Sequence, residues 1–150
     1  MALKAQIKDE MKAALLSGDR FVGETLRNLT AAILDEEVKL GKRDEGLSDE
    51  EIEKVVAREV KKRNESAKIY HDNNRPDLAE PEEREIKVLQ AYLPKQLDET
   101  ELAAIIEAKI AELSVTGPQA MGQVIGAVKK QVGNAADGAA IARIVKQKLD

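Results

Sequence analysis

The 150-residue chain has no cysteine and no tryptophan, and it contains one histidine, two tyrosines and one phenylalanine. Without thiols, the chain cannot form disulfides, thiolate metal sites or a cysteine nucleophile. With so few aromatic rings, its core has to be built from Leu, Ile, Val and Ala. Charged residues make up 35% of the sequence, and this mixture of aliphatic and charged residues favours helices.

Long apolar runs are also missing. No stretch approaches the roughly 20 consecutive apolar residues that cross a bilayer, and the N-terminus mixes charges rather than presenting an apolar run. We therefore expect no signal peptide and no membrane partner, and the sequence predicts a cytoplasmic protein.

Catalytic motifs are equally scarce. The sequence has neither a Walker loop nor a GxGxxG, and the glycine-rich stretch at 117–138 lacks the preceding strand that a nucleotide site needs. His71 stands among polar residues at a predicted helix end, with no nucleophile motif beside it. Neighbouring acids such as Glu36 and Glu37 do not face each other on a helix. We expect no catalytic residue, no metal site and no cofactor, so the chain is interpreted as non-catalytic by itself.

Apolar residues recur at helical spacing along the whole chain, and no segment alternates with a period of two. The pattern predicts an all-α protein. Residues 1–94 are expected to form an N-terminal bundle of four helices, with Pro81 in the first turn of the fourth. Residues 95–150 are expected to form a small three-helix domain.

The segment from Met121 to Gly138 is the most informative part of the sequence. Gly122 and Gly126 lie four residues apart in a predicted helix, where each glycine costs about 1 kcal/mol relative to alanine. Such a cost predicts that another backbone approaches closely at these two positions. The approaching backbone belongs either to the small domain itself or to a partner helix.

Positive charge gathers near the C-terminus although the net charge is −4. From residue 114 onward, five bases stand against two acids. Of these bases, Lys129 and Lys130 end one predicted helix, whereas Arg143 and Lys146 project from the next, which starts at Gly138. The free amides and positive dipole end at Gly138 form a candidate phosphate site. Alternatively, the lysines only stabilise a helix C-terminus, without any ligand.

Several segments carry a resemblance to a known family. They are MKAAL at residues 11–15, LR at 26–27 with AAI at 31–33, REVKKR at 58–63 with Ser66, YLPKQL at 92–97, MGQV at 121–124, ADG at 136–138 and VK at 145–146. In this order they resemble the YqeY family of small bacterial proteins, which share their C-terminal part with the tail of the GatB subunit of tRNA amidotransferase. One departure is Gly133-Asn134, which replaces a basic residue in the turn.

The resemblance implies a helical bundle followed by a three-helix domain, and a tail that contacts tRNA away from the reaction centre. The family label of carbon–nitrogen ligase with glutamine as amido donor is inherited from GatB, whose catalytic cradle has no counterpart in this sequence. We therefore expect tRNA, or the amidotransferase subunits, as partner. The expected RNA-binding residues are Lys129, Lys130, Gly138, Arg143 and Lys146. The alternatives are a protein-interaction module without RNA and an accessory to the ligase activity.

Overall fold

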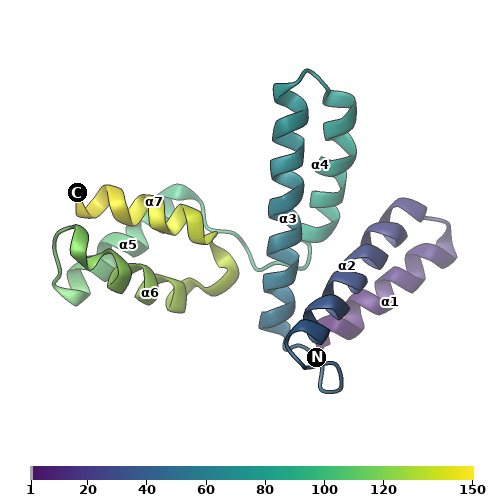
Figure 1. Ribbon diagram of the computed structural model, residues 1–150, viewed down its shortest axis with the longest axis horizontal. Helices are drawn as coiled ribbons and strands as arrows, with labels where there is room; N and C mark the ends of the chain where they lie inside the picture. Colours follow the sequence, from purple (N-terminus) through teal and green to yellow (C-terminus); the bar gives the residue numbers. More distant parts are fainter. Residues whose placement is uncertain (1) are drawn as a thin grey trace. The chain divides into compact units, whose positions relative to one another are not determined.

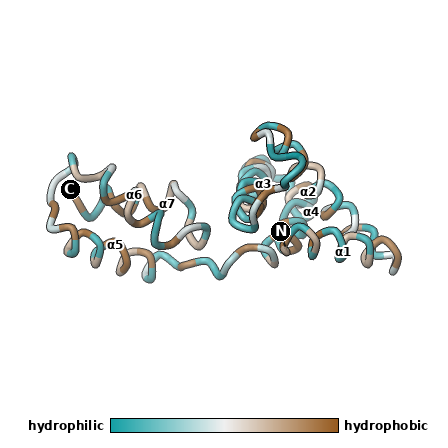
Figure 2. Tube along the Cα trace, turned by 90° about the horizontal axis from the view of Figure 1, so that it is seen from below, coloured by the Kyte–Doolittle hydropathy of each residue, from teal (hydrophilic) through white to brown (hydrophobic). Residues whose placement is uncertain are grey.

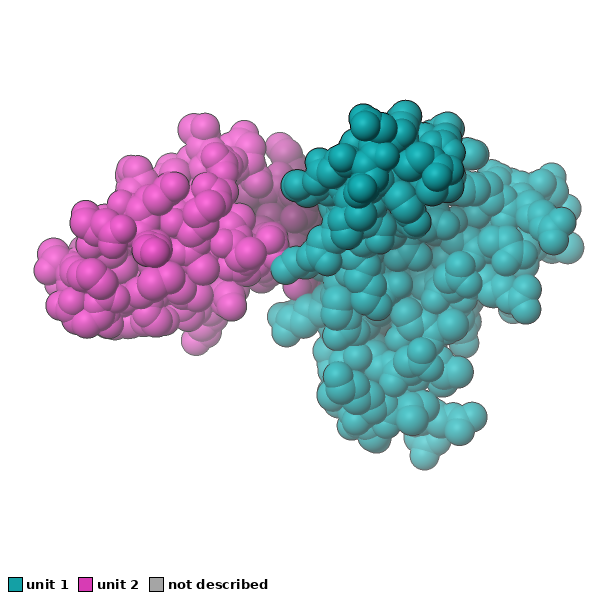
Figure 3. Space-filling model, turned by 45° about the horizontal axis from the view of Figure 1, so that its top comes forward, with its two compact units in different colours: residues 1–93 teal, residues 94–150 magenta. Residues whose placement is uncertain are grey.

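The computed structural model describes residues 2–150, which form seven α-helices, two short 3-10 helices and no strand (Figure 1). The prediction of an all-α protein is confirmed. The chain divides into two compact units, the first ending at Leu93 and the second covering Pro94–Asp150 (Figure 3). The first unit contains α1 (Ala2–Ser17), α2 (Arg20–Lys39), α3 (Asp49–Asp72) and α4 (Pro76–Gln90).

Two antiparallel helical hairpins make up the first unit (Figure 1). Helices α1 and α2 form one hairpin, joined at Gly18, which has a φ of +84°, and at Asp19, whose carboxylate caps α2 by accepting from the amide of Val22. Helices α3 and α4 form the other. The hydrophobic core between them is aliphatic except for one tyrosine, and it consists of Ile7, Leu26, Leu29, Ile33, Leu47, Ile52, Val55, Val56, Val60, Ile86, Leu89 and Tyr92.

A buried carboxylate ties three segments of this unit together. Glu37 on α2 is only 2% exposed, and its Oε2 accepts from Nζ of Lys4 on α1 at 2.6 Å. The same oxygen accepts from the amide of Leu47 at 3.3 Å, in the loop before α3. A charge taken out of water is tolerated only with such partners. Glu37 therefore fixes α1 and this loop against α2.

We predict that Lys4→Met destabilises the protein by about 2 kcal/mol, because it leaves the Glu37 carboxylate buried without its cation. Urea denaturation monitored by circular dichroism measures the change. Lys61→Met is the matched control, since Lys61 is exposed on α3 and should change the free energy of unfolding by less than about 0.5 kcal/mol. Equal effects of the two substitutions would contradict the role given to Glu37.

Helix α3 begins with a complete capping box. The Ser48 hydroxyl accepts from the amide of Glu51, and the Glu51 carboxylate accepts from the amide of Ser48. Glu51 also accepts from Lys42 Nζ at 2.8 Å. The hydrogen bond from Lys42, together with the one from the Ser48 amide, lowers the pKa of Glu51 from 4.5 to about 2.

This shift predicts a defined acid dependence. A carboxylate whose pKa is lower in the folded state than in the unfolded state stabilises the protein fully at pH values above its unfolded-state pKa. That contribution is lost as the pH falls toward the folded-state pKa. Stability should therefore decline between pH 4.5 and about 2, the two values for Glu51. Glu51→Gln keeps a capping side chain and should flatten this decline in urea titrations across the window. Glu65→Gln, at an exposed position of α3, should leave the decline as it is.

Helices α3 and α4 are held together by ion pairs as well as by aliphatic contacts. Arg63 on α3 is half-buried, and its Nε donates to Glu85 on α4 at 2.7 Å.

The Tyr92 hydroxyl, just beyond α4, donates to Glu10 on α1. Burial, followed by this hydrogen bond, raises the pKa of Tyr92. The end of α4 is thereby fastened to the first hairpin.

The prediction for Pro81 was wrong. Helix α4 begins at Pro76, which occupies its first turn, so Pro81 lies inside the helix, on its exposed face. A proline at a first-turn position is tolerated because the missing N–H has no partner there anyway. At Pro81 the helix instead forgoes one backbone hydrogen bond, and it continues because Ala79, Ile86 and Leu89 remain packed in the unit.

The second unit is a three-helix assembly of α5 (Glu99–Leu113), α6 (Met121–Val132) and α7 (Gly138–Leu149), with the 3-10 helices η1 (Pro118–Ala120) and η2 (Gly133–Ala135) between them. Brown, apolar stretches mark each of these helices in Figure 2. The core consists of Leu102, Ile106, Ala120, Val124, Val128, Ile141, Ile144, Val145 and Leu149. None of the helices within residues 2–150 is long and apolar enough to cross a membrane.

Candidate nucleic-acid interface

Lys129 and Lys130 occupy the last turn of α6, which ends at Gly133 with a φ of +55°. Both lysines are exposed, and no acid in residues 2–150 forms an ion pair with either of them. Lysines at a helix C-terminus gain a few tenths of a kcal/mol from the helix dipole. Their charge is nevertheless fully available to an outside anion.

The side chain of Lys129 lies across the start of α7. A Cβ atom built on Gly138 would stand 3.4 Å from Cε and 3.5 Å from Nζ of Lys129. These are ordinary contact distances, so the ammonium group of Lys129 lies directly beside the first turn of α7. The side chain of Asp137, at the N-cap, makes no capping hydrogen bond to that turn. The structure thus brings an ammonium group and a helix N-terminus together, two groups that both attract anions.

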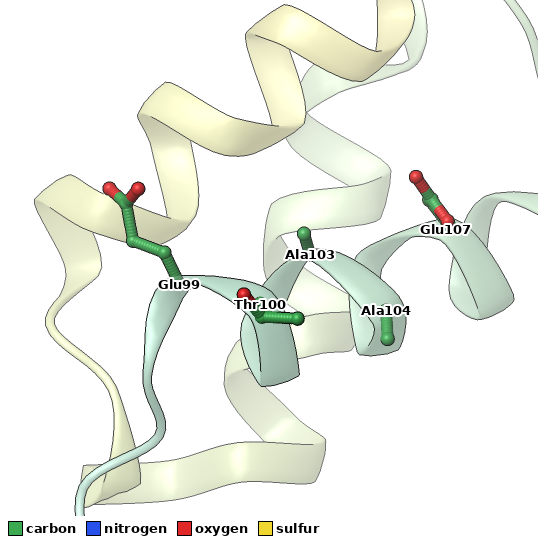
Figure 4. A pocket seen from close by; sticks show the side chains of 5 residues that line it. All are labelled: Glu99, Thr100, Ala103, Ala104 and Glu107. Atoms are coloured by element: carbon green, nitrogen blue, oxygen red, sulfur yellow. The ribbon is translucent and has the colours of Figure 1, made fainter.

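Arg143 is placed differently, because its guanidinium donates to the carboxylate of Glu99 at the start of α5. Lys148 likewise pairs with Glu107, two turns further along α5. Figure 4 shows Glu99 and Glu107 with Thr100, Ala103 and Ala104 between them, lining a shallow hollow of about 420 Å³. These carboxylates neutralise two of the five bases after residue 114.

Glu99 and Glu107 were not predicted as neighbours of the basic cluster. A signal was present, since residues 98–113 carry five acids and one base next to the positive C-terminal segment. Sequence alone does not show which base meets which acid, because that depends on how α5 crosses α7.

Lys146 lies on α7, eight residues beyond Gly138, a separation of about 12 Å along the helix axis. It is exposed, and no described acid pairs with it. The structure therefore brings Lys129 and Gly138 into contact, keeps Lys130 in the same helical turn as Lys129, and places Lys146 further along. Arg143 joins this cluster only if it leaves Glu99.

Of the two interpretations of Gly122 and Gly126, packing against another backbone of the small domain was wrong. A Cβ atom at either position would meet nothing within 4 Å, so no backbone within residues 2–150 approaches them, and contact with a partner helix stays a prediction. Both glycines lie on the exposed face of α6, opposite Val124 and Val128. The close approach occurs at Gly23 on α2, where a Cβ would stand 2.5 Å from Leu15 Cδ2 and 3.4 Å from the Leu15 amide nitrogen.

We therefore predict that Gly126→Ala raises the free energy of unfolding by about 1 kcal/mol, the helix-propensity difference between the two residues. Gly23→Ala should gain less or lose stability, because Leu15 has to move out of its packed position. The two substitutions are compared by urea denaturation. An equal gain at both positions would contradict the close α1–α2 approach at Gly23.

The seven α-helices of residues 2–150 and the two compact units define a small, two-unit, all-α class of protein, with positive charge gathered near its C-terminus. Residues 4–149 match the model of a family described as "Yqey-like protein". The chain belongs to this family, as its sequence motifs indicated.

Curated relatives extend the family to yeasts. "Altered inheritance of mitochondria protein 41, mitochondrial" of Eremothecium gossypii is 34% identical over 115 residues, 75% of this chain and 61% of that protein. The protein of the same name from Vanderwaltozyma polyspora is 31% identical over 87 residues, 58% of this chain and 46% of that protein. The Lachancea thermotolerans protein is 28% identical over 116 residues, 76% of this chain and 61% of that protein. The chain thus spans about half to three-fifths of these relatives.

The names of these relatives overturn the expectation of a cytoplasmic protein, because they place the relatives in mitochondria. That expectation depended on the lack of an apolar run. Such a lack does not distinguish one aqueous compartment from another.

Proposed function

We propose that the second unit binds the phosphate backbone of tRNA through Lys129, Lys130 and Lys146. The observation that supports this most directly is the position of Lys129, whose ammonium lies across the start of α7 without an acidic partner. A phosphate there meets a cation and the positive end of a helix at once. Lys130 and Lys146 add charge around it.

Arg143 contributes to this surface conditionally. Its guanidinium is occupied by Glu99, but the pair is exposed on both sides and is therefore weak. A phosphate can compete for the guanidinium by forming two parallel hydrogen bonds with it. Gly138 contributes through its backbone, because it is the first residue of α7 and lies beside the Lys129 ammonium.

Backbone recognition suits this surface better than base recognition. The second unit contains no Phe, Tyr, Trp or His in residues 94–150, so it cannot stack unpaired bases on a ring. Structured RNA presents its phosphates and 2′-hydroxyls instead. The resemblance of this unit to the GatB tail supports tRNA as the structured RNA, and an association with the amidotransferase as its setting.

A salt titration of tRNA binding tests the proposal. Three to four phosphate contacts with a structured RNA predict a plot of log K against log salt with a slope of about −2.7 to −3.6. Lys129→Glu with Lys130→Glu should abolish the binding at moderate salt. The matched control is Lys54→Glu with Lys61→Glu, which makes the same charge change at exposed positions of α3. Loss of binding in the control, or none in the Lys129/Lys130 variant, would refute the assignment.

A protein-interaction module is the second candidate, and the exposed face at Gly122 and Gly126 favours it. Two glycines on a helix surface let a partner backbone approach closely. In that case a protein partner should co-purify at high salt without RNA, and Gly122→Leu with Gly126→Leu should release it. An accessory role in ligation would instead appear as glutamine-dependent amide formation in the presence of the chain.

A further inference from the structure

The outer face of the α1–α2 hairpin combines exposed aliphatic side chains with unpaired basic ones. Four large apolar residues are exposed on this hairpin to an unusual degree: Leu16 by 89%, Val38 by 59%, Leu34 by 45% and Leu15 by 42%. Elsewhere in this unit Ile69 (60%), Leu40 (47%) and Leu78 (38%) are also exposed, so the hairpin carries four of the seven exposed large apolar side chains among residues 2–150.

Three contacts between α1 and α2 fix how the two helices face each other. Lys4 meets Glu37, Met11 meets Thr30, and Leu15 meets Gly23, so these residues form the seam between α1 and α2. Successive residues of an α-helix are 100° apart around its axis, so the seam residues fix which residues face outward. On each helix, the residues next to the seam on the side away from the core form an outer stripe. The stripe of α1 carries Lys8, Lys12 and Leu16, and that of α2 carries Arg20, Arg27, Ala31, Leu34 and Val38. Leu15, which is 42% exposed, lies at the border between the seam and the stripe of α1.

No acid lies within these two stripes, whereas Asp9, Glu24 and Asp35 lie at their margins. Lys8, Lys12, Arg20 and Arg27 form no ion pair with any residue in 2–150. Elsewhere in this unit many basic residues are paired, as Arg58 is with Glu36 and Arg63 is with Glu59 and Glu85. The surface formed by the two stripes, about 27 Å long on α2, is here called the hairpin face.

We propose that the hairpin face docks onto an anionic phospholipid surface. Basic side chains meet the lipid phosphates, while the leucines and Val38 enter the boundary between headgroups and acyl chains. This combination of Lys or Arg with aliphatic residues on one helical surface is what interfacial binding requires. The sequence analysis expected no membrane partner because no segment can span a bilayer, and docking onto its surface requires no spanning segment.

Two other occupants fit the hairpin face less well. An RNA backbone would be attracted by the four basic side chains, but it would make no favourable contact with the exposed Leu16 and Val38. A symmetric dimer of this chain would bury the leucines, but it would bring four unpaired bases of one copy against the same four of the other. A lipid surface satisfies both kinds of side chain, and its charge complements theirs.

Co-sedimentation of the full chain with vesicles tests this. One set of vesicles is phosphatidylcholine, and the other is phosphatidylcholine mixed with phosphatidylglycerol. We expect binding to the mixed vesicles only. Replacing Lys8, Lys12 and Arg27 by Gln should weaken it roughly 100-fold, since each base near an anionic surface contributes about a factor of five. Leu16→Gln with Val38→Gln should weaken binding at high salt as well.

The matched control replaces Lys54, Lys61 and Lys87 by Gln, three exposed bases of α3 and α4 that have the same total charge. Circular dichroism confirms that each variant is folded. The proposal is overturned if the unchanged protein ignores mixed vesicles, or if the control variant loses as much binding as the hairpin-face variant. It is also overturned if the hairpin-face variant loses tRNA binding or changes its oligomeric state while vesicle binding persists unchanged.

Discussion

The buried carboxylate of Glu37 is the constraint on which the first unit depends. Carboxylates are almost never fully buried unless they are paired, and Glu37 is paired with one cation and one amide that come from different segments. Because Lys4 lies near the start of α1 and Leu47 directly precedes the cap of α3, a single charge sets the position of both. The fully buried Leu47 then closes the core at that end.

In the second unit, acidic and basic side chains lie mostly on different helices. Helix α5 brings acids and α7 brings bases, and Glu99 and Glu107 take up Arg143 and Lys148. These pairs are exposed and contribute little to stability. Their consequence is electrostatic, because they remove two bases from the surface and concentrate the remaining positive charge at Lys129, Lys130 and Lys146. A cluster of this kind raises the local potential although the whole chain is acidic.

The features that could be predicted from the sequence are those that depend on residues close together in the chain. Helical periodicity marks the helices, and the Ser48–Glu51 spacing marks the capping box at the start of α3, both of which depend only on neighbours in the chain. Prediction from the sequence failed where the cause is tertiary. A glycine in a helix lowers helix stability relative to alanine, but the sequence does not show why glycine is present. At Gly23 the reason is close packing with Leu15, whereas Gly122 and Gly126 face open space. Pro81 was placed wrongly for a similar reason. The first turn of α4 is occupied by Pro76, so Pro81 lies inside the helix.

The candidate site itself was only partly visible in the sequence. The count of bases after residue 114 identified the positive segment, but the contact between Lys129 and Gly138 and the capture of Arg143 by Glu99 depend on how three helices pack. The hairpin face is a still clearer case. Lys8, Lys12, Arg20 and Arg27 are dispersed among acids in the sequence, and the pairing of α1 with α2 sorts them onto one side. The two basic surfaces differ in their neighbours, which are glycines in one and leucines in the other, and this difference is why we assign them to different polyanions.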